Sequence, residues 1–392
     1  MRRQSAGIER TRRGGVLSRP GSSSSTTRRT TFSWTGRRSN GVDSAGAPPV
    51  SSAWALRGKE RDLARVLVTG GAGFIGSHLV DALVDAGETV RVLDDLSTGR
   101  RENLDRSLAT GRAELLVGSV VDPLLAESAA RGCDRIFHLA ATVGVRRVLS
   151  DPVAGLRNNI LGTDSIIRAA RRSRPRSLVM FSSSEVYGRT SGGALAEDAA
   201  TLIGPTVVPR WSYAAGKVVG EYLALGEQRR SGLPVTIVRC FNTCGPRQVG
   251  SYGMVIPSLL RQALLGEPLT VYGDGAQTRC FSYVGDVVRG VLSLSGLSSA
   301  CGETFNIGTD QEIAIIDLAR MIRDLCASRS EILLVPYEKA YGDGFEDVPR
   351  RVPDLRKIRR WIGYDPEVDL EKLLTVTRDW VQERLAVDAT VA

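Results

Sequence analysis

Short apolar runs and amphipathic stretches alternate along the chain from about residue 65 to residue 240. The apolar runs have the length of buried strands and lie at residues 66–68, 89–94, 113–117, 134–139, 177–182 and 235–239. Helical patterns lie between them, at residues 74–87, 152–172 and 212–231. Alternating strands and helices are joined by right-handed crossovers, which build a parallel sheet with helices on both faces. The pattern therefore predicts an α/β fold with a doubly wound, Rossmann-type sheet, whose ligands lie at the carboxyl ends of the strands.

The regular alternation ends after Phe241, where Pro and Gly interrupt the chain. Shorter patterns predict a helix at residues 256–265, a strand at 269–272 and a last helix at 370–385. We expect residues 61–241 to form the Rossmann domain, and residues 242–392 to form mainly a smaller α/β lobe that binds substrate. Within the second part, residues 286–307 are expected to return to the first sheet.

The first 60 residues show no periodic apolar face and are rich in Arg, Ser, Thr and Gly, so we expect residues 1–60 to be disordered. Ten Arg stand against Glu9 and Asp43 in the first 50 residues, a charge of +8 out of the total of +9. Three interpretations remain open: a transit peptide, a basic arm for a membrane or polyphosphate, or a start site assigned too far upstream. The third is favoured, because the first strand begins only at Arg65.

The remainder of the chain is nearly neutral, so its charge does not indicate nucleic-acid binding. The sequence contains neither the apolar core of a signal peptide nor a run of about 18 apolar residues, so we expect a cytoplasmic protein without a membrane partner. Its six cysteines form no CxxC cluster, and neither Cys240 nor Cys244 has a His or further Cys nearby. Buried thiols are favoured over zinc, and no metal is predicted.

The sequence TGGAGFIG follows the first predicted strand at once and opens the first helix. Glycine is needed where the backbone takes positive φ or touches a ligand, and the unpaired N–H groups of a first helical turn attract phosphate. Asp94 ends the second strand, where a carboxylate accepts the ribose hydroxyls of an adenine dinucleotide and repels the extra phosphate of NADP. Together these features predict NAD as the cofactor, held by Asp94 and by Gly70, Gly73, Phe74, Ile75 and Gly76.

Candidate catalytic residues lie at the end of the fifth strand and on the helix that follows. Tyr213 and Lys217 are four residues apart and therefore share a helix face, so the ammonium is expected to lower the pKa of the phenol and to hydrogen-bond a ribose. A phenolate in this position can take a proton from a sugar hydroxyl while hydride leaves the same carbon for the nicotinamide. Ser183 completes the set as hydroxyl partner of the same substrate oxygen.

A series of motifs resembles, in number and order, the extended short-chain dehydrogenase/reductase family that acts on nucleotide-diphosphate sugars. They are TGGAGFIG, Asp94, Asp122, HLAA at residues 138–141, Asn159, SSSEVYG, the Tyr213–Lys217 pair and FNTCGPR at residues 241–247. The matches extend over about residues 65–385.

This resemblance implies a tightly bound NAD that is recycled, and a homodimer packed through helices of the first domain. It places Asp122 near the adenine, and the cofactor site further includes Val121, Leu139, Ala140, Ala141, Asn159, Tyr213 and Lys217. It places a nucleotide-diphosphate sugar on Ser183, Ser184, Asn242, Val271, Tyr272, Arg279 and Arg351. A guanidinium suits a diphosphate because it donates two parallel hydrogen bonds.

The reaction is less closely defined, because members of this family all oxidise the sugar at C4 and then diverge. A 4-epimerase acting on UDP-glucuronate or UDP-glucose is favoured. Glu185 is the fourth candidate catalytic residue: sugar-nucleotide decarboxylases of the family often carry Glu at this position, whereas many of its epimerases carry a small residue. The segment TVGVRRVLSDP after HLAA differs from that of the decarboxylases, and decarboxylation of UDP-glucuronate ranks second. Dehydration ranks third, because the Asp–Glu pair of the family 4,6-dehydratases is replaced by Ser184 and Glu185.

Two other classes are disfavoured. A Ser-His-Asp hydrolase needs a histidine base, and the chain holds only His78 and His138, which we interpret as structural. A non-catalytic NAD-binding sensor typically lacks the Tyr–Lys pair that this chain retains.

Overall fold

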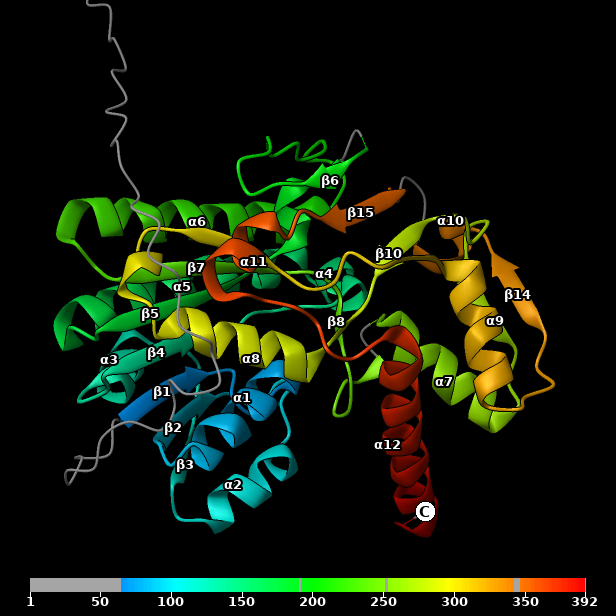
Figure 1. Cartoon of the computed structure of the whole chain (residues 1–392), viewed down its shortest axis with the longest axis horizontal. Coiled ribbons are helices and arrows are strands. Elements are labelled where there is room, and N and C mark those ends of the chain that lie inside the picture. Colours follow the sequence, from blue (N-terminus) through cyan, green and yellow to red (C-terminus); the bar gives the residue numbers. More distant parts are fainter. Residues whose placement is uncertain (1–64, 190–191, 251–252, 342–345, 392) are drawn as a thin grey trace, which may run out of the picture. The chain divides into compact units, whose positions relative to one another are not determined.

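A seven-stranded parallel sheet forms the centre of the computed structural model, which describes residues 65–189, 192–250, 253–341 and 346–391 (Figure 1). Its strand order is β12-β7-β5-β4-β1-β2-β3. The strands are β1 (Arg65–Thr69), β2 (Thr89–Asp94), β3 (Ala113–Val117), β4 (Arg135–His138), β5 (Ser177–Ser183), β7 (Val235–Cys240) and β12 (Thr304–Ile307). The order reverses between β1 and β4, the point at which open α/β sheets bind ligands. The predicted fold class is confirmed, and the expectation for residues 1–60 lies outside the described residues.

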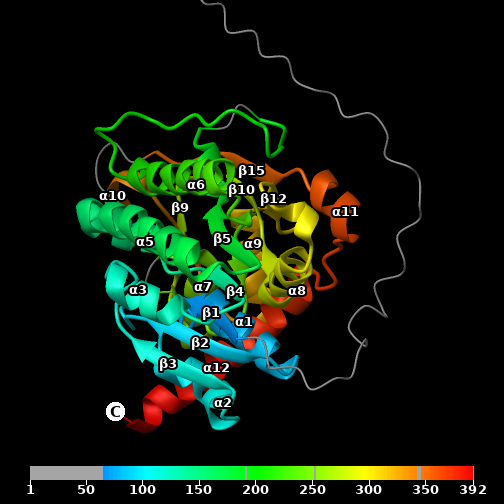
Figure 2. The ribbon, with the colours of Figure 1, turned by 90° about the vertical axis from the view of Figure 1, so that its left-hand side faces the viewer.

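Helices cover both faces of this sheet. One face packs against α1 (Phe74–Asp85) and α8 (Val284–Ser295), and the other against α3 (Pro123–Ala130), α5 (Pro152–Ser173) and α6 (Trp211–Ser231). Figure 2 shows α5 and α6 next to each other, with α8 across β5. Side chains alternate between the two faces along each strand, so Val66 and Val68 enter one core and Leu67 the other. Burial on both sides explains why the strands read as nearly continuous apolar runs.

The second lobe contains a four-stranded sheet that the sequence pattern does not predict. Its order is β13-β10-β15-β6, formed by Glu312–Ala314, Thr278–Cys280, Arg350–Pro353 and Ala194–Leu195. Strands of two to four residues are too short to show a period of two. In the register of β10 and β15, which run parallel, Arg279 lies opposite Arg351.

Further short elements complete the described chain. The strands are β8 (Thr243–Cys244), β9 (Leu269–Tyr272), β11 (Ser282–Tyr283) and β14 (Ile332–Val335). The helices are α2 (Asp105–Ala109), α4 (Val145–Ser150), α7 (Val255–Leu265), α9 (Ile315–Leu325), α10 (Tyr337–Tyr341), α11 (Arg356–Ile362) and α12 (Leu370–Val391), with 3-10 turns η2 (Arg101–Leu104), η3 (Ser184–Tyr187) and η5 (Ser298–Ala300). A separate apolar core joins α7, α9 and α12. Among the helices of the described residues, none combines the length and apolar character that crossing a membrane requires.

His138 is buried at the end of β4 and holds neighbouring elements together. Its Nδ1 lies 2.8 Å from Thr69 Oγ1 and its Nε2 lies 3.3 Å from Thr163 Oγ1. Burial, with the charge of Lys217 as a smaller cause, lowers the pKa of His138 to about 3. The imidazole is therefore neutral at physiological pH, which agrees with a structural role.

This burial predicts a pH dependence of stability. Between the unfolded-state pKa of 6.5 and about 3, the unfolded chain binds a proton at His138 that the folded chain does not, so stability falls as pH falls through this window. We expect His138→Gln to reduce the slope of unfolding free energy against pH by up to about 1.4 kcal/mol per pH unit. Urea unfolding of both proteins between pH 4 and 6.5 measures the slopes, and parallel lines would contradict the assignment.

Candidate active site

The glycine-rich loop is shaped so that only glycine fits at two of its positions. Gly70 follows β1 with φ of +70°, and a Cβ there would come within 2.7 Å of Ala140 N. A Cβ on Gly76 would come within 2.1 Å of Gly70 O. Because the loop has no side chains at these positions, a ligand can come close to the first turn of α1. The unpaired N–H groups of that turn suit a pyrophosphate.

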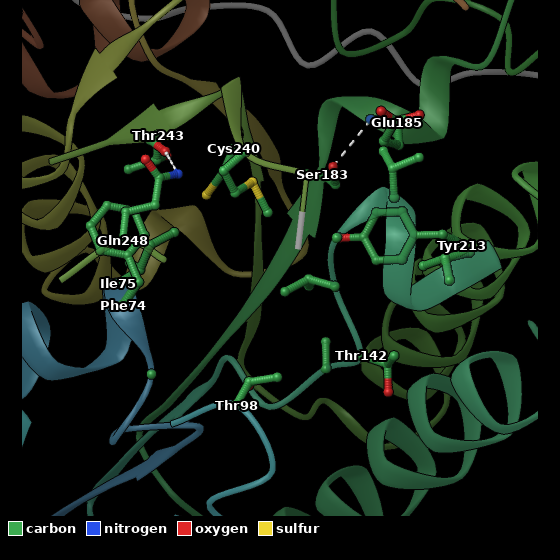
Figure 3. A pocket seen from close by; sticks show the side chains of 18 of the residues that line it. Phe74, Ile75, Thr98, Thr142, Ser183, Glu185, Tyr213, Cys240, Thr243 and Gln248 are labelled. Carbon is green, nitrogen blue, oxygen red and sulfur yellow. Dashed lines mark hydrogen bonds between the residues drawn. The ribbon is translucent and has the colours of Figure 1, made fainter. Parts of the chain in front are cut away.

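This loop borders a cavity of about 530 Å³ at the carboxyl ends of the strands. Most predicted site residues line it. On the cofactor side they are Gly70, Gly73, Phe74, Ile75, Gly76, Asp94, Val121, Leu139, Ala140 and Ala141. Beyond these lie Ser183, Ser184, Glu185, Tyr213, Lys217, Asn242, Tyr272, Arg279 and Arg351. In Figure 3, Phe74 and Ile75 lie across the cavity from Tyr213.

Three predicted residues are absent from the cavity lining and make structural contacts instead. The Asp122 carboxylate caps α3 by accepting from the N–H groups of Leu124 and Leu125. The Asn159 amide accepts from Thr142 N at 2.7 Å and donates to Thr142 O at 3.2 Å, which holds the loop after β4. Val271 is 1% exposed and belongs to the core of the second lobe. Ligand contacts by these three residues stay predictions.

Asp94 connects the glycine loop to the cofactor side of the cavity. Its Oδ2 accepts from Ala72 N at 2.9 Å and its Oδ1 from Leu96 N at 2.8 Å. Burial raises the pKa of Asp94, and the two backbone hydrogen bonds oppose that rise. A carboxylate has about four acceptor positions, so this one can still accept ribose hydroxyls.

Ser183 and Tyr213 meet where β5 ends and α6 begins. Figure 3 shows the Tyr213 ring reaching from α6 toward Ser183, whose hydroxyl acts to lower the pKa of the phenol. Ser183 is held in turn, because its Oγ accepts from Glu185 N at 3.2 Å. The geometry suits two hydroxyls that act on one substrate oxygen.

Tyr213 does not have the lowered pKa that the sequence predicts from its spacing to Lys217. Lys217 Nζ donates to Phe181 O at 2.8 Å, and burial lowers the pKa of Lys217 to about 8. Burial raises the pKa of Tyr213 above its ordinary value, and the hydrogen bond from Ser183 only partly opposes this rise. The expected lowering is therefore wrong for the protein without ligand, because the sequence does not reveal how completely the phenol is buried.

A cluster of largely buried charges lines the cavity next to Ser183. Arg351 Nη1 donates to Glu185 Oε1 at 2.6 Å, and Arg210 Nη2 donates to Glu185 Oε2 at 3.2 Å. Burial opposes the charged form of Glu185, but Arg351, Arg210 and Arg279 together lower its pKa to about 2. Glu185 is therefore a carboxylate throughout the physiological pH range.

Asp347 extends this cluster toward the second lobe. Its Oδ1 accepts from Arg279 Nη2 at 2.9 Å and from Arg210 Nη1 at 3.4 Å, and its Oδ2 accepts from Tyr337 Oη at 2.9 Å. Three guanidinium groups thus face two carboxylates. The sequence analysis missed Arg210 and Asp347. Arg210 precedes the helix of Tyr213 by one residue, a signal that could have found it, whereas no local pattern marks Asp347.

Arg351 retains hydrogen-bonding capacity inside the cavity. Its side chain is 4% exposed, and its Nε and Nη2 are buried without a hydrogen-bond partner in the described part of the chain. A buried donor without an acceptor costs about 1–3 kcal/mol. An anionic ligand group would satisfy these donors. In contrast, no group of three or more His, Cys, Asp or Glu within the described ranges could hold a metal ion.

The sheet, the glycine loop and the Ser183–Tyr213–Lys217 set define a NAD-dependent enzyme of the extended short-chain dehydrogenase/reductase type. A family model described as the NAD dependent epimerase/dehydratase family matches residues 66–308. The chain belongs to this family, and NAD is its cofactor.

Several known proteins are similar over most of the chain. A UDP-N-acetyl-alpha-D-glucosaminuronate decarboxylase from Bacillus cytotoxicus is 40% identical over 81% of this chain and 98% of its own. UDP-glucuronic acid decarboxylase 1 from Danio rerio is 37% identical over 83% of this chain and 74% of its own. The solved UDP-glucuronic acid 4-epimerase from Bacillus cereus, in complex with UDP-glucuronic acid and NAD, is 27% identical with a TM-score of 0.72, and the match covers 82% of this chain and 99% of that one. These similarities support a nucleotide sugar as the substrate.

We predict that Asp94→Asn weakens NAD binding about tenfold and reduces the preference for NAD over NADP, because a charged acceptor of the ribose hydroxyls is lost. Titration calorimetry of cofactor-depleted protein with each dinucleotide measures both constants. Asp95→Asn is the matched control, since it removes the neighbouring exposed carboxylate, which accepts from Ser97 N. An unchanged NAD/NADP ratio in Asp94→Asn would place the ribose carboxylate elsewhere.

Proposed function

We propose that this protein is a NAD-dependent decarboxylase of a UDP-linked uronic acid. The sequence analysis favours 4-epimerisation and ranks decarboxylation second, whereas the similarities support the reverse order. The relatives from Bacillus cytotoxicus and Danio rerio, at 40% and 37% identity, are named as decarboxylases of uronates, and the 4-epimerase from Bacillus cereus is 27% identical. UDP-glucuronate and UDP-N-acetylglucosaminuronate are the leading substrates.

The observation that carries this proposal is the buried guanidinium of Arg351. Two of its nitrogens lack a partner among the described residues, and it lines the same cavity as Ser183 and Tyr213. A carboxylate at C6 of the sugar would supply the missing acceptors while C4 lies near the two hydroxyls. A neutral hydroxymethyl group would leave this buried positive charge less well satisfied.

Tyr213 and Ser183 would act at the C4 hydroxyl of the sugar. Tyr213 accepts the hydroxyl proton as C4 is oxidised, and Ser183 hydrogen-bonds the same oxygen. Bound NAD supplies the hydride acceptor and, in its oxidised form, a positive charge that favours the phenolate of Tyr213.

Oxidation at C4 turns the C6 carboxylate into that of a β-keto acid. The C5–C6 bond then breaks, CO2 leaves, and the electron pair moves onto O4 of an enolate that Tyr213 and Ser183 stabilise by hydrogen bonds. A proton adds at C5, and reduction of C4 completes the reaction, which consumes one proton overall.

Glu185 and Arg351 together would hold the carboxylate without neutralising it. Negative charge leaves the carboxylate in the transition state, so a full ion pair with Arg351 would stabilise the ground state more than the transition state. Glu185 already shares the charge of Arg351 through the 2.6 Å hydrogen bond. Arg351 can therefore orient the carboxylate while its departure as CO2 stays favourable.

The proposed function predicts the product of the reaction. We expect the full-length protein with catalytic NAD to release CO2 from UDP-glucuronate or UDP-N-acetylglucosaminuronate, and to leave UDP-glucose unchanged. Mass spectrometry and proton NMR of the sugar nucleotide identify the product. A product of unchanged mass with an altered C4 proton coupling would instead establish the 4-epimerase.

The second prediction concerns Tyr213. Tyr213→Phe should retain NAD and lower kcat by roughly 10²–10⁴-fold, because the proton acceptor at C4 is removed while the ring packing remains. Tyr222→Phe is the matched control, since Tyr222 lies on the same helix and is 76% exposed. Turnover of Tyr213→Phe at the wild-type rate would remove Tyr213 from the mechanism.

A further inference from the structure

Arg210 lies at the centre of the charge cluster. It is not one of the three residues, Ser183, Tyr213 and Lys217, to which the chemistry at C4 is assigned. Its side chain is 6% exposed, and its guanidinium lies 4.9 Å from the centre of the Trp211 ring. On one side it donates to Glu346 O and Asp347 Oδ1. On the other it donates to Glu185, 3.2 Å from Oε2 and 3.5 Å from Oε1. Arg210 thus ties the turn after β5 to the second lobe.

The two carboxylate oxygens of Glu185 accept hydrogen bonds from two different guanidinium groups. Arg351 takes Oε1 through Nη1 alone, and Arg210 takes Oε2. An arginine and a carboxylate left to themselves commonly form two parallel hydrogen bonds. Such a pair would use a second nitrogen of Arg351 in addition to Nη1, so the sharing of Glu185 leaves one more nitrogen of Arg351 available, and Nε and Nη2 are both unpartnered within the described part of the chain.

We propose that Arg210 is a positioning residue of the site: by holding one oxygen of Glu185, it prevents a two-pronged Glu185–Arg351 pair and keeps Arg351 available for the substrate carboxylate. This inference rests on the proposed function. It assigns to Arg210 no contact with substrate and no proton transfer. Its effect is confined to ligands that carry a carboxylate at C6.

The charge of the cluster supports the same conclusion. Arg210, Arg279 and Arg351 face Glu185 and Asp347, which leaves one excess positive charge in a buried site. Without Arg210 the cluster would be neutral, and Glu185 would turn to Arg351. The loss of the excess positive charge and the closer pairing of Glu185 with Arg351 would each weaken the binding of an anionic sugar. The binding of a neutral sugar would depend on neither of them.

The test measures binding in a Tyr213→Phe background, where slow turnover leaves the substrate intact. Titration calorimetry of the full-length protein with NAD gives the Kd of UDP-glucuronate and of UDP-glucose. We expect Arg210→Gln to weaken UDP-glucuronate roughly tenfold to a hundredfold and UDP-glucose less than threefold. Arg210→Lys, which keeps the charge, should recover part of the loss.

Two further variants distinguish positioning from a general structural role. Adding Arg210→Gln to Glu185→Gln should cause no further loss of UDP-glucuronate binding, because the carboxylate that Arg210 restrains is already gone. Arg189→Gln is the matched control, since Arg189 also pairs with Glu346, is 54% exposed and does not touch Glu185. We expect its affinities to equal those of the parent.

Three results would overturn the inference: equal weakening of both sugar nucleotides by Arg210→Gln, additive losses in the double variant, or the same loss in Arg189→Gln. Circular dichroism and NAD content verify folding, and Arg210→Lys carries the test if Arg210→Gln does not fold. The proposed function fails separately, if the wild-type protein releases no CO2 from either uronate.

Discussion

The ion pair between Glu185 and Arg351 joins the two halves of the molecule. Glu185 lies in the turn directly after β5 of the large sheet, and Arg351 lies on β15 of the four-stranded sheet. Burying either charge alone would be strongly unfavourable, and removing one partner of a buried pair typically costs about 3–5 kcal/mol. The placement of β15 beside the turn after β5 and the charge at this end of the cavity therefore depend on one another.

The strands of the large sheet could be predicted because short runs of neighbouring apolar residues mark them in the sequence. The inner strands of this sheet are buried on both faces, so they appear as apolar runs, and the predicted runs at residues 177–182 and 235–239 lie within β5 and β7. The four-stranded sheet was not predictable, because it pairs residues 194–195 with residues 352–353 through strands too short for periodicity. That sheet nevertheless places Arg279 opposite Arg351. The two arginines were found by resemblance, whereas their pairing depends on tertiary structure.

The candidate site likewise has features that the sequence predicts and features that depend on tertiary structure. Tyr213 and Lys217 share a helix face whatever the rest of the fold does, so helical spacing is enough to bring them together. Their electrostatic relation is different, because burial and the carbonyl of Phe181 decide it. Arg210 and Asp347 act through partners distant in the chain, Glu185 and Arg279, and a single sequence does not reveal such pairs.

Epimerisation and decarboxylation share the 4-ketone, so the handling of the C6 group decides between them. The sequence analysis set the segment TVGVRRVLSDP against decarboxylation. In the structure, Arg146 of this segment donates to Tyr272 Oη at 3.0 Å and Arg147 donates to Ser97 O at 3.0 Å. The groups that surround the buried end of the cavity are Glu185, Arg210 and Arg351, which come from other segments. The first residues of the segment, 142–146, nevertheless line the same cavity as Ser183 and Tyr213, so the segment contributes to the site, and the identity of the product decides between the two reactions.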